Sequence, residues 1–273
     1  MAVYFVTGKL GSGKTLFTID VIQQALGQGR RVASNLDLNL EFMLGAKSSV
    51  SATRLPDKPR LVDLEALGTG YASDEPYNES RFGVIVLDEL SMWMNTRTFQ
   101  DKERLGVLQW FLHARKLRWD IYFIVQHIEA IDKQLRESMC EHLVVCSRAD
   151  RIKVMRAFKL PQIHLARVYY GDNESAPLVD RIFYRSKELY GAYQTEQVFT
   201  DDLEWLNGRA VDMRAMYSVV PPMLTAGRYH QDATSDDSVS IPRFFLSLLL
   251  WPTVRLSCAL SRDCRRYFLN ADN

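Results

Sequence analysis

The glycine-rich stretch at residues 8–15, GKLGSGKT, constrains the fold of this chain more than any other feature. It fits the pattern G-x-x-x-x-G-K followed by Ser or Thr, and it comes after an apolar run that predicts a strand over residues 2–7. Glycines let backbone N–H groups turn inward around a phosphate chain, and a helix that begins at Lys14 adds the positive end of its dipole. The stretch therefore predicts a phosphate-binding loop between a strand and a helix. A strand–helix turn without a ligand is the alternative.

The loop also predicts how a triphosphate is bound. The expected nucleotide-binding residues are Gly8, Lys9, Leu10, Gly11, Ser12, Gly13, Lys14 and Thr15. The Lys14 ammonium can reach the β- and γ-phosphates, which makes it a catalytic candidate, and the Thr15 hydroxyl is a candidate ligand for Mg²⁺. The guanine-specifying pattern N-K-x-D does not occur in the sequence. We therefore expect ATP as the nucleotide and Mg²⁺ as its metal.

Two acidic residues, Asp88 and Glu89, come at the end of an apolar run that predicts a buried parallel strand over residues 83–88. Burying carboxylates beside such a strand is costly unless a cation or a proton-accepting role compensates. We expect Asp88 to hold the Mg²⁺ shell and Glu89 to orient and deprotonate the attacking water. The alternative is that both acids cap the next helix or lie in a solvated loop.

A third polar strand end and several cations complete the predicted catalytic set. Gln126 ends the strand-like run 120–126, and ligands of open α/β sheets lie outside the carboxyl ends of the strands. Gln126 is then placed to sense the γ-phosphate or the attacking water. Arg115 is the main candidate for an arginine that acts on a neighbouring subunit, and other cations share this possibility: Arg97, Lys116, Arg118 and Arg151. An ordinary polar strand end and solvated surface cations are the alternatives.

The order of the predicted elements indicates an α/β fold. Helices and strands alternate: helix 14–27, strand 30–34, strand 83–88, helix 101–117, strand 120–126, helix 128–138 and strand 142–147. We expect a P-loop NTPase fold of the RecA-like, additional-strand type, with a mainly parallel sheet flanked by helices and a C-terminal tail. On the helix 101–117, four residues are expected to face the core: Leu105, Leu108, Phe111 and Leu112. The tyrosine-rich region 150–200 is expected to extend the sheet or to pack on this core.

The chain divides by composition into three expected parts. Residues 1–200 form the ATPase domain, residues 201–240 a partly polar connection, and residues 241–273 an apolar and basic tail. The tail suits an anionic membrane surface, although its apolar run is shorter than the roughly twenty residues of a spanning helix; a docked helix or an unstructured end is the alternative. A net charge of +1 argues against a global attraction to nucleic acid, and four cysteines without a CxxC pair are typical of reduced thiols. No signal peptide is visible, so we expect an intracellular start.

Several segments together resemble one family. They include MAVYFVTGKLGSGKTL, NLDLNL, RLPDKP, WMNTRTFQDKER, WFLHARKLRWDIYFIVQ and YRSKELYGAYQTEQVF. They are similar to segments of filamentous-phage assembly ATPases of the zonula-occludens-toxin-like family, and the resemblance runs from residue 1 to about residue 230. It implies an ATP-hydrolysing motor that drives phage assembly and extrusion, with export of single-stranded DNA and exchange of coat proteins at the bacterial inner membrane. Residues 8–15 match the family's nucleotide loop, and Asp88 with Glu89 match its acidic strand end.

The resemblance also implies partners and a location. The implied partners are further copies of the chain in a homo-oligomer such as a ring, the phage major coat protein, phage single-stranded DNA with its binding protein, and the phage outer-membrane secretin. Family members continue through a membrane span, whereas Pro252 and Arg255 interrupt the apolar stretch here. We therefore expect association with the cytoplasmic face of the inner membrane and leave a true span open. Two other functions share the phosphate loop: a small-molecule kinase, and a nucleotide-gated scaffold that does not hydrolyse ATP.

Overall fold

The computed structural model describes most of the chain up to Tyr229. The described residues are 3–90, 102–131, 133–148, 163–185, 187–197, 199, 203–206, 209–212 and 215–229. One compact unit runs from Met1 to Tyr229. Arg97, Arg151 and the tail at 241–273, for all of which the sequence makes predictions, lie outside the described residues. The expected domain boundary at residue 200 stays a prediction.

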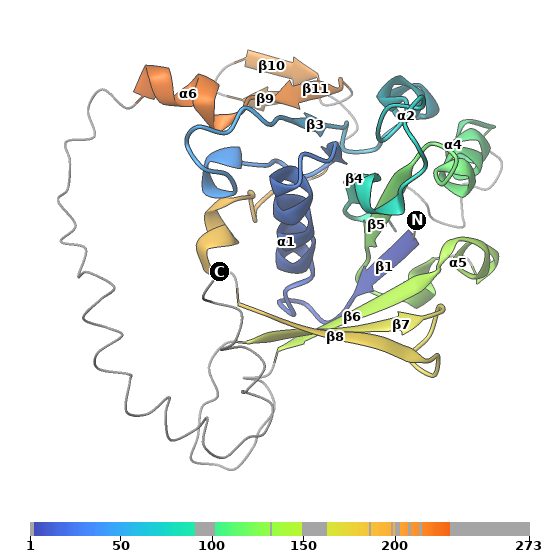
Figure 1. The fold of residues 1–273 in the computed structure, drawn as a ribbon. Coiled ribbons are helices and arrows are strands. Elements are labelled where there is room, and N and C mark those ends of the chain that lie inside the picture. The colour runs from blue at the N-terminus through green and yellow to red at the C-terminus, as the bar shows by residue number, and fades with distance from the viewer. Residues whose placement is uncertain are drawn as a thin grey trace, which may run out of the picture. The chain divides into compact units, whose positions relative to one another are not determined.

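A sheet of nine strands organises the described residues (Figure 1). Its strand order is β11–β3–β2–β4–β5–β1–β6–β7–β8. The strands are β1 (Val3–Thr7), β2 (Val32–Ser34), β3 (Ala52–Arg54), β4 (Gly83–Leu87), β5 (Trp119–Ile124), β6 (His142–Arg148), β7 (His164–Tyr170), β8 (Leu178–Tyr184) and β11 (Tyr217–Val219). Neighbours from β3 to β6 pair in parallel, and β7, β8 and β11 pair antiparallel. The mainly parallel sheet is therefore confirmed, and β5 stands between β4 and β1 as the additional-strand type requires.

Helices cover both faces of this sheet (Figure 1). They are α1 (Lys14–Gly27), α2 (Leu61–Leu67), α4 (Lys102–His113), α5 (Lys133–Met139) and α6 (Pro222–Tyr229), with short 3-10 turns η1 (Leu40–Phe42), η2 (Glu79–Arg81), η4 (Ile128–Ala130) and η6 (Lys187–Gly191). The alternation of β1 separates two cores: Val6 packs in the cluster that contains α1, and Phe5 packs in the cluster that contains α2, α4 and α5. A separate hairpin joins β9 (Leu203–Leu206) to β10 (Arg209–Asp212). None of the helices described is both long and apolar enough to cross a membrane.

The buried face of α4 differs from the predicted one. Leu108 and Phe111 are buried as expected, but Leu105 and Leu112 are 48% and 49% exposed, so their prediction is wrong. The neighbouring helix explains the difference: a Cβ on Gly106 would lie 2.7 Å from Leu61 of α2. This close approach turns a different side of α4 inward, which buries Val107, Trp110 and the adjoining Ala114.

The register of the parallel strands aligns their carboxyl ends. Val6 of β1 pairs with Ile124 of β5, and Leu87 of β4 pairs with Phe123 of β5. The segments that follow β1, β4 and β5 therefore leave the sheet at one edge, where open α/β sheets bind their ligands.

Candidate active site

The loop after β1 contains three glycines with a positive φ: Gly8, Gly11 and Gly13. Gly8 has φ +148° and Gly13 has φ +91°, both in the region that disfavours other residues. A Cβ on Gly8 would lie 2.4 Å from the carbonyl oxygen of Cys146, and a Cβ on Gly13 would lie 2.4 Å from Nδ1 of His164. The loop is thus held against β6 and β7 so closely that side chains are excluded.

Two side chains from the antiparallel strands β7 and β8 contact carbonyl oxygens of this loop. The ring nitrogen Nδ1 of His164 lies 2.9 Å from the carbonyl oxygen of Ser12, and the Tyr184 hydroxyl donates to the carbonyl oxygen of Gly13 at 3.0 Å. The two rings stack with centroids 5.2 Å apart. Because these contacts hold the carbonyl groups of Ser12 and Gly13, they fix the orientation of the peptide groups of the loop. Sequence reasoning missed both residues, since they lie about 150 positions or more from the loop.

The Lys14 ammonium donates to the carbonyl oxygen of Gly8 at 2.9 Å, so the side chain folds back across the loop. Ser12 is 3% exposed, and its hydroxyl has no hydrogen-bond partner among the described residues. A buried hydroxyl without a partner is costly. The loop therefore offers a cation and an unsatisfied hydroxyl where α1 begins, which suits a phosphate group.

The acids after β4 lie opposite the loop. The amide of Glu89 donates to the Asp88 carboxylate at 2.7 Å, and Nε2 of Gln126 donates to Oε1 of Glu89 at 3.3 Å. Burial raises the pKa of Asp88 to about 6, and the neighbouring Glu89 charge adds to this effect while Lys14 opposes it. Glu89 itself has φ +53°, a left-handed conformation that is uncommon for a residue with a side chain.

A buried asparagine holds the position of Asp88. The Asn35 side chain accepts from the amide of Asp88 at 2.8 Å and donates to the carbonyl oxygens of Asp88 and Asp57 at 3.1 and 3.0 Å. Asn35 is fully buried just after β2, the strand next to β4. Its amide fits these backbone groups of β4 and the loop at 57, so it fixes the end of the strand that carries the acids. Asn35 was not predicted from the sequence.

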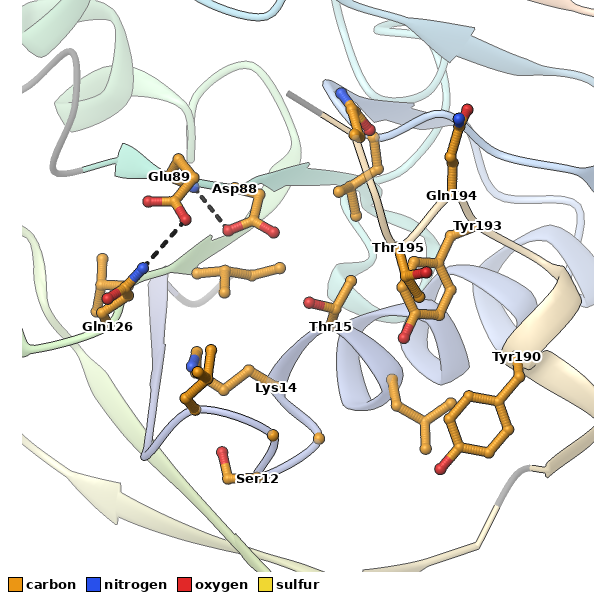
Figure 2. A pocket seen from close by; sticks show the side chains of 18 of the residues that line it. Ser12, Lys14, Thr15, Asp88, Glu89, Gln126, Tyr190, Tyr193, Gln194 and Thr195 are labelled. Carbon is orange, nitrogen blue, oxygen red and sulfur yellow. Dashed lines mark hydrogen bonds between the residues drawn. The ribbon is translucent and has the colours of Figure 1, made fainter. Parts of the chain in front are cut away.

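A cavity of about 420 Å³ joins these groups (Figure 2). Most predicted site residues line it: Leu10, Gly11, Ser12, Gly13, Lys14, Thr15, Asp88, Glu89 and Gln126. Gly8 and Lys9 instead line an adjoining cavity of about 770 Å³, which shares Ser12, Gln126 and Arg148 with the first. In Figure 2 the acids and Gln126 occupy one side of the cavity, Lys14 and Thr15 its floor, and Tyr190, Tyr193 and Thr195 the opposite side.

Thr15 and Asp88 could supply oxygen ligands to a magnesium ion. Both present oxygen, which Mg²⁺ prefers, and both line the cavity that the loop encloses. Mg²⁺ usually takes one or two protein ligands and keeps several waters, so two protein oxygens beside an open cavity are sufficient. Above the raised pKa of Asp88, its carboxylate is ionised and able to bind the ion.

The structure does not bring Arg115 to this cavity. Its guanidinium pairs with Glu79 at 3.2 Å, and its side chain is 65% exposed, beyond the end of α4. Arg148, which sequence reasoning missed, lines the cavity instead. The signal that could have found Arg148 is its position at the carboxyl end of β6, the strand next to β1.

Comparisons with known proteins identify relatives of this chain. The model of the family described as zonular occludens toxin (Zot) matches residues 2–188. The Gene 1 protein of Enterobacteria phage fd is 40% identical over 260 residues, which cover 90% of this chain and 71% of that protein. The Gene 1 protein of Salmonella phage IKe is 44% identical over 218 residues, which cover 75% of this chain and 59% of that protein.

A solved structure of a zonular occludens toxin is also similar to this chain. The N-terminal domain of zonular occludens toxin from Neisseria meningitidis is 16% identical with a TM-score of 0.43, covering 71% of this chain and 98% of that domain. The match of the family model and the identity to the phage proteins decide the assignment. This chain belongs to the zonular occludens toxin family and is a relative of the Gene 1 proteins of filamentous phages.

Proposed function

We propose that this chain is an Mg²⁺-dependent ATPase that drives the assembly and extrusion of filamentous phage. The observation that carries the proposal is the shared cavity: the phosphate loop, the two acids and Gln126 come from three separate strand ends and line one space. Family membership and the Gene 1 relatives support the phage role.

Each polar group then has one task. Lys14 leaves the Gly8 carbonyl and binds the β- and γ-phosphates, and the loop amides bind the remaining oxygens. Thr15 and Asp88 would hold Mg²⁺, which neutralises charge on the phosphates when it is bound. Glu89, positioned by Gln126 at 3.3 Å, accepts the proton of the water whose oxygen attacks the γ-phosphorus as the bond to the β-phosphate oxygen breaks.

Positive charge against the transition state comes from Lys14 and Arg148 within the chain. Arg115 remains the proposed arginine that acts on a neighbouring subunit, since its exposed position beyond α4 is accessible to another copy. This proposal requires a homo-oligomer, such as a ring.

The proposed setting is the cytoplasmic face of the bacterial inner membrane. There the motor would exchange the binding protein of phage single-stranded DNA for the major coat protein and deliver the particle to the outer-membrane secretin. These partners follow from the resemblance to phage assembly ATPases, and each is part of the proposal.

The test measures ATP turnover of the purified chain and phage yield from cells that carry the same variants. Lys14→Ala should lower turnover at least about 100-fold, because it removes a cation that stabilises the transition state. Glu89→Gln should lower turnover by a similar factor or more while ATP binding persists, because it removes the proton acceptor. Both variants should abolish phage release.

Matched controls separate this result from general damage. Lys47→Ala and Glu65→Gln change exposed residues outside the cavity and should keep normal turnover and yield. Normal phage yield from Glu89→Gln would contradict the motor and favour a scaffold that binds ATP without hydrolysis. Turnover that requires an added small-molecule acceptor would instead identify a kinase.

A further inference from the structure

The cavity has a second wall that phosphate chemistry does not use. This wall belongs to the segment at residues 190–199, which follows β8 and returns to the start of α1 (Figure 2). Three aromatic and three polar side chains from this segment line the cavity: Tyr190, Tyr193, Phe199, Gln194, Thr195 and Gln197. We call this set the aromatic wall. In Figure 2 its labelled members lie across the cavity from the acids, on the far side of Thr15: Tyr190, Tyr193, Gln194 and Thr195.

The backbone of the aromatic wall is fixed to the core, whereas the ring of Tyr190 is partly exposed to solvent. Leu189 and Ala192 are 2% and 0% exposed, so they fix the turn to the core, whereas Tyr190 between them is 47% exposed. A Cβ on Gly191 would lie 2.8 Å from the ring of Phe42, so the backbone of the turn is pressed against that ring. An aromatic side chain that serves the core would be buried. The backbone of Tyr190 is therefore held in place by buried neighbours, and its ring lines the cavity with part of its surface exposed.

Hydrogen bonds tie the aromatic wall to the loop that follows β2. The amide of Asn39 donates to the carbonyl oxygen of Ala192 at 2.8 Å, and the amide of Asp37 donates to Oε1 of Gln197 at 2.9 Å. Nε2 of Gln197 donates to the carbonyl oxygen of Asn35 at 2.9 Å. Because Asn35 also holds Asp88, the distance between the aromatic wall and the acids is set by the fold before any ligand arrives.

The dimensions and chemistry of the two sides match the two halves of a nucleotide. A cavity of about 420 Å³ lies within the range of small-molecule sites, which join an apolar lining to a few placed polar groups. The loop and acids provide cations and oxygen ligands for phosphates and their metal. The opposite side provides flat aromatic surface, a hydroxyl and an amide that can both donate and accept.

We propose that the aromatic wall is the subsite for the base and sugar of the nucleoside triphosphate, with the base stacked on Tyr190 and flanked by Tyr193. Gln194 and Thr195 bind the polar edge of the base or the sugar hydroxyls. This inference rests on the proposed function, since it requires a nucleotide on the phosphate loop. It goes further, because it assigns the part of the ligand that carries no phosphate.

The test compares two ligands that share phosphate groups and differ in the base. Isothermal titration with Mg²⁺ measures the affinity for ADP and for inorganic pyrophosphate, neither of which is turned over by an ATPase. The wild-type chain should bind ADP more tightly than pyrophosphate. Tyr190→Ala and Tyr190→Leu should weaken ADP binding about tenfold and leave pyrophosphate binding unchanged, since a stacked base contributes about this much. Tyr190→Phe keeps the ring and should bind ADP as the wild type does.

Two further variants keep the outcomes distinct. Tyr170→Ala removes another exposed tyrosine, 57% exposed on β7 and outside the cavity, and should change neither affinity. Lys14→Ala should weaken both ligands. If Lys14→Ala binds both normally, the phosphate site of the proposed function fails. If the wild type binds ADP and pyrophosphate equally, or if the Ala and Leu variants at position 190 weaken both equally or neither, the base subsite is overturned while the phosphate site stands.

Discussion

Replacing Gly13 with Ala tests how closely β7 packs against the phosphate loop. Two separate costs are expected. The first is backbone strain, because Gly13 has φ +91°. The second is steric, because the new Cβ would lie 2.4 Å from Nδ1 of His164. A control exists in the same chain: Gly29 also has a positive φ, +70°, but a Cβ there meets nothing within 4 Å. Gly29→Ala therefore isolates the strain.

The structure identifies the contacts that are lost, and typical energies give the size of each cost. Strain at a left-handed residue is about 1 kcal/mol. The overlap must displace His164, which loses its contact with the Ser12 carbonyl oxygen and its stack on Tyr184, each worth about 1 kcal/mol. Gly13→Ala should then lower the free energy of unfolding by about 3 kcal/mol, and Gly29→Ala by about 1 kcal/mol. His164→Ala loses the same two contacts and some packing, about 2–3 kcal/mol.

The assay is urea unfolding of the nucleotide-free chain, followed by fluorescence, for the single variants and for the double variant of Gly13 and His164. Once the His164 ring is gone, the added methyl group at position 13 should contribute only its strain. The double variant should therefore lose about 3–4 kcal/mol instead of the roughly 5–6 kcal/mol expected from addition. Additive losses, or equal losses for the two glycine variants, would refute the contact between the loop and β7.

Three further predictions concern Asp88, the asparagine that holds it, and the two arginines. Asp88→Asn removes a carboxyl group whose pKa burial raises from 3.8 to about 6, so ionisation of Asp88 destabilises the metal-free fold as the pH rises from about 4 through 6. Urea unfolding with EDTA measures the free energy of unfolding without metal. This free energy should be the same for the variant and the wild type near pH 4, and about 3 kcal/mol higher for the variant at pH 8. Equal stability of the two proteins at both pH values would contradict this. Asn35→Ala leaves the buried amide of Asp88 without its partner. We therefore expect the free energy of unfolding to fall by about 2–4 kcal/mol and ATP turnover to decrease. Wild-type values for both quantities would argue against the role of Asn35. In dilute, monomeric protein, Arg148→Ala should lower ATP turnover, because Arg148 lines the cavity. Arg115→Ala should not, because Arg115 pairs with Glu79 outside the cavity. Equal losses of turnover in the two variants would contradict this placement.

The elements nearest the phosphate loop could be predicted from the sequence because local patterns determine them. A continuous apolar run ending in Asp88 is typical of a central parallel strand, and the register of β4 against β5 then brings Gln126 to the same edge. Periodicity was less informative for α4. Apolar residues occur on several sides of this helix, so spacing alone fits both the predicted stripe through Leu105 and Leu112 and the observed one through Val107 and Phe111. The close approach of α2 at Gly106 decides between them, and that contact has no local signal.

The aromatic side of the site could not be predicted for a related reason. Tyr190 and Tyr193 come more than 160 positions after the phosphate loop, and aromatic residues at such spacing are more often core. Their position depends on backbone hydrogen bonds to residues 37–39, which any sequence there could provide. Similarly, His164 gives no motif with Ser12, because its partner is a carbonyl oxygen.

Asn35 explains why these distant segments form one site. Its side chain binds the backbone of Asp88, and its own carbonyl oxygen accepts from Gln197 of the segment that carries the aromatic wall. Asn35 is fully buried, and a buried hydrogen-bonded residue cannot move without leaving polar groups unsatisfied. A displacement of the segment at 190–199 therefore strains the same residue that positions the acids. The side chain and the peptide group of Asn35 hold the two sides of the cavity, so this residue just after β2 sets the separation between the aromatic wall and the acids.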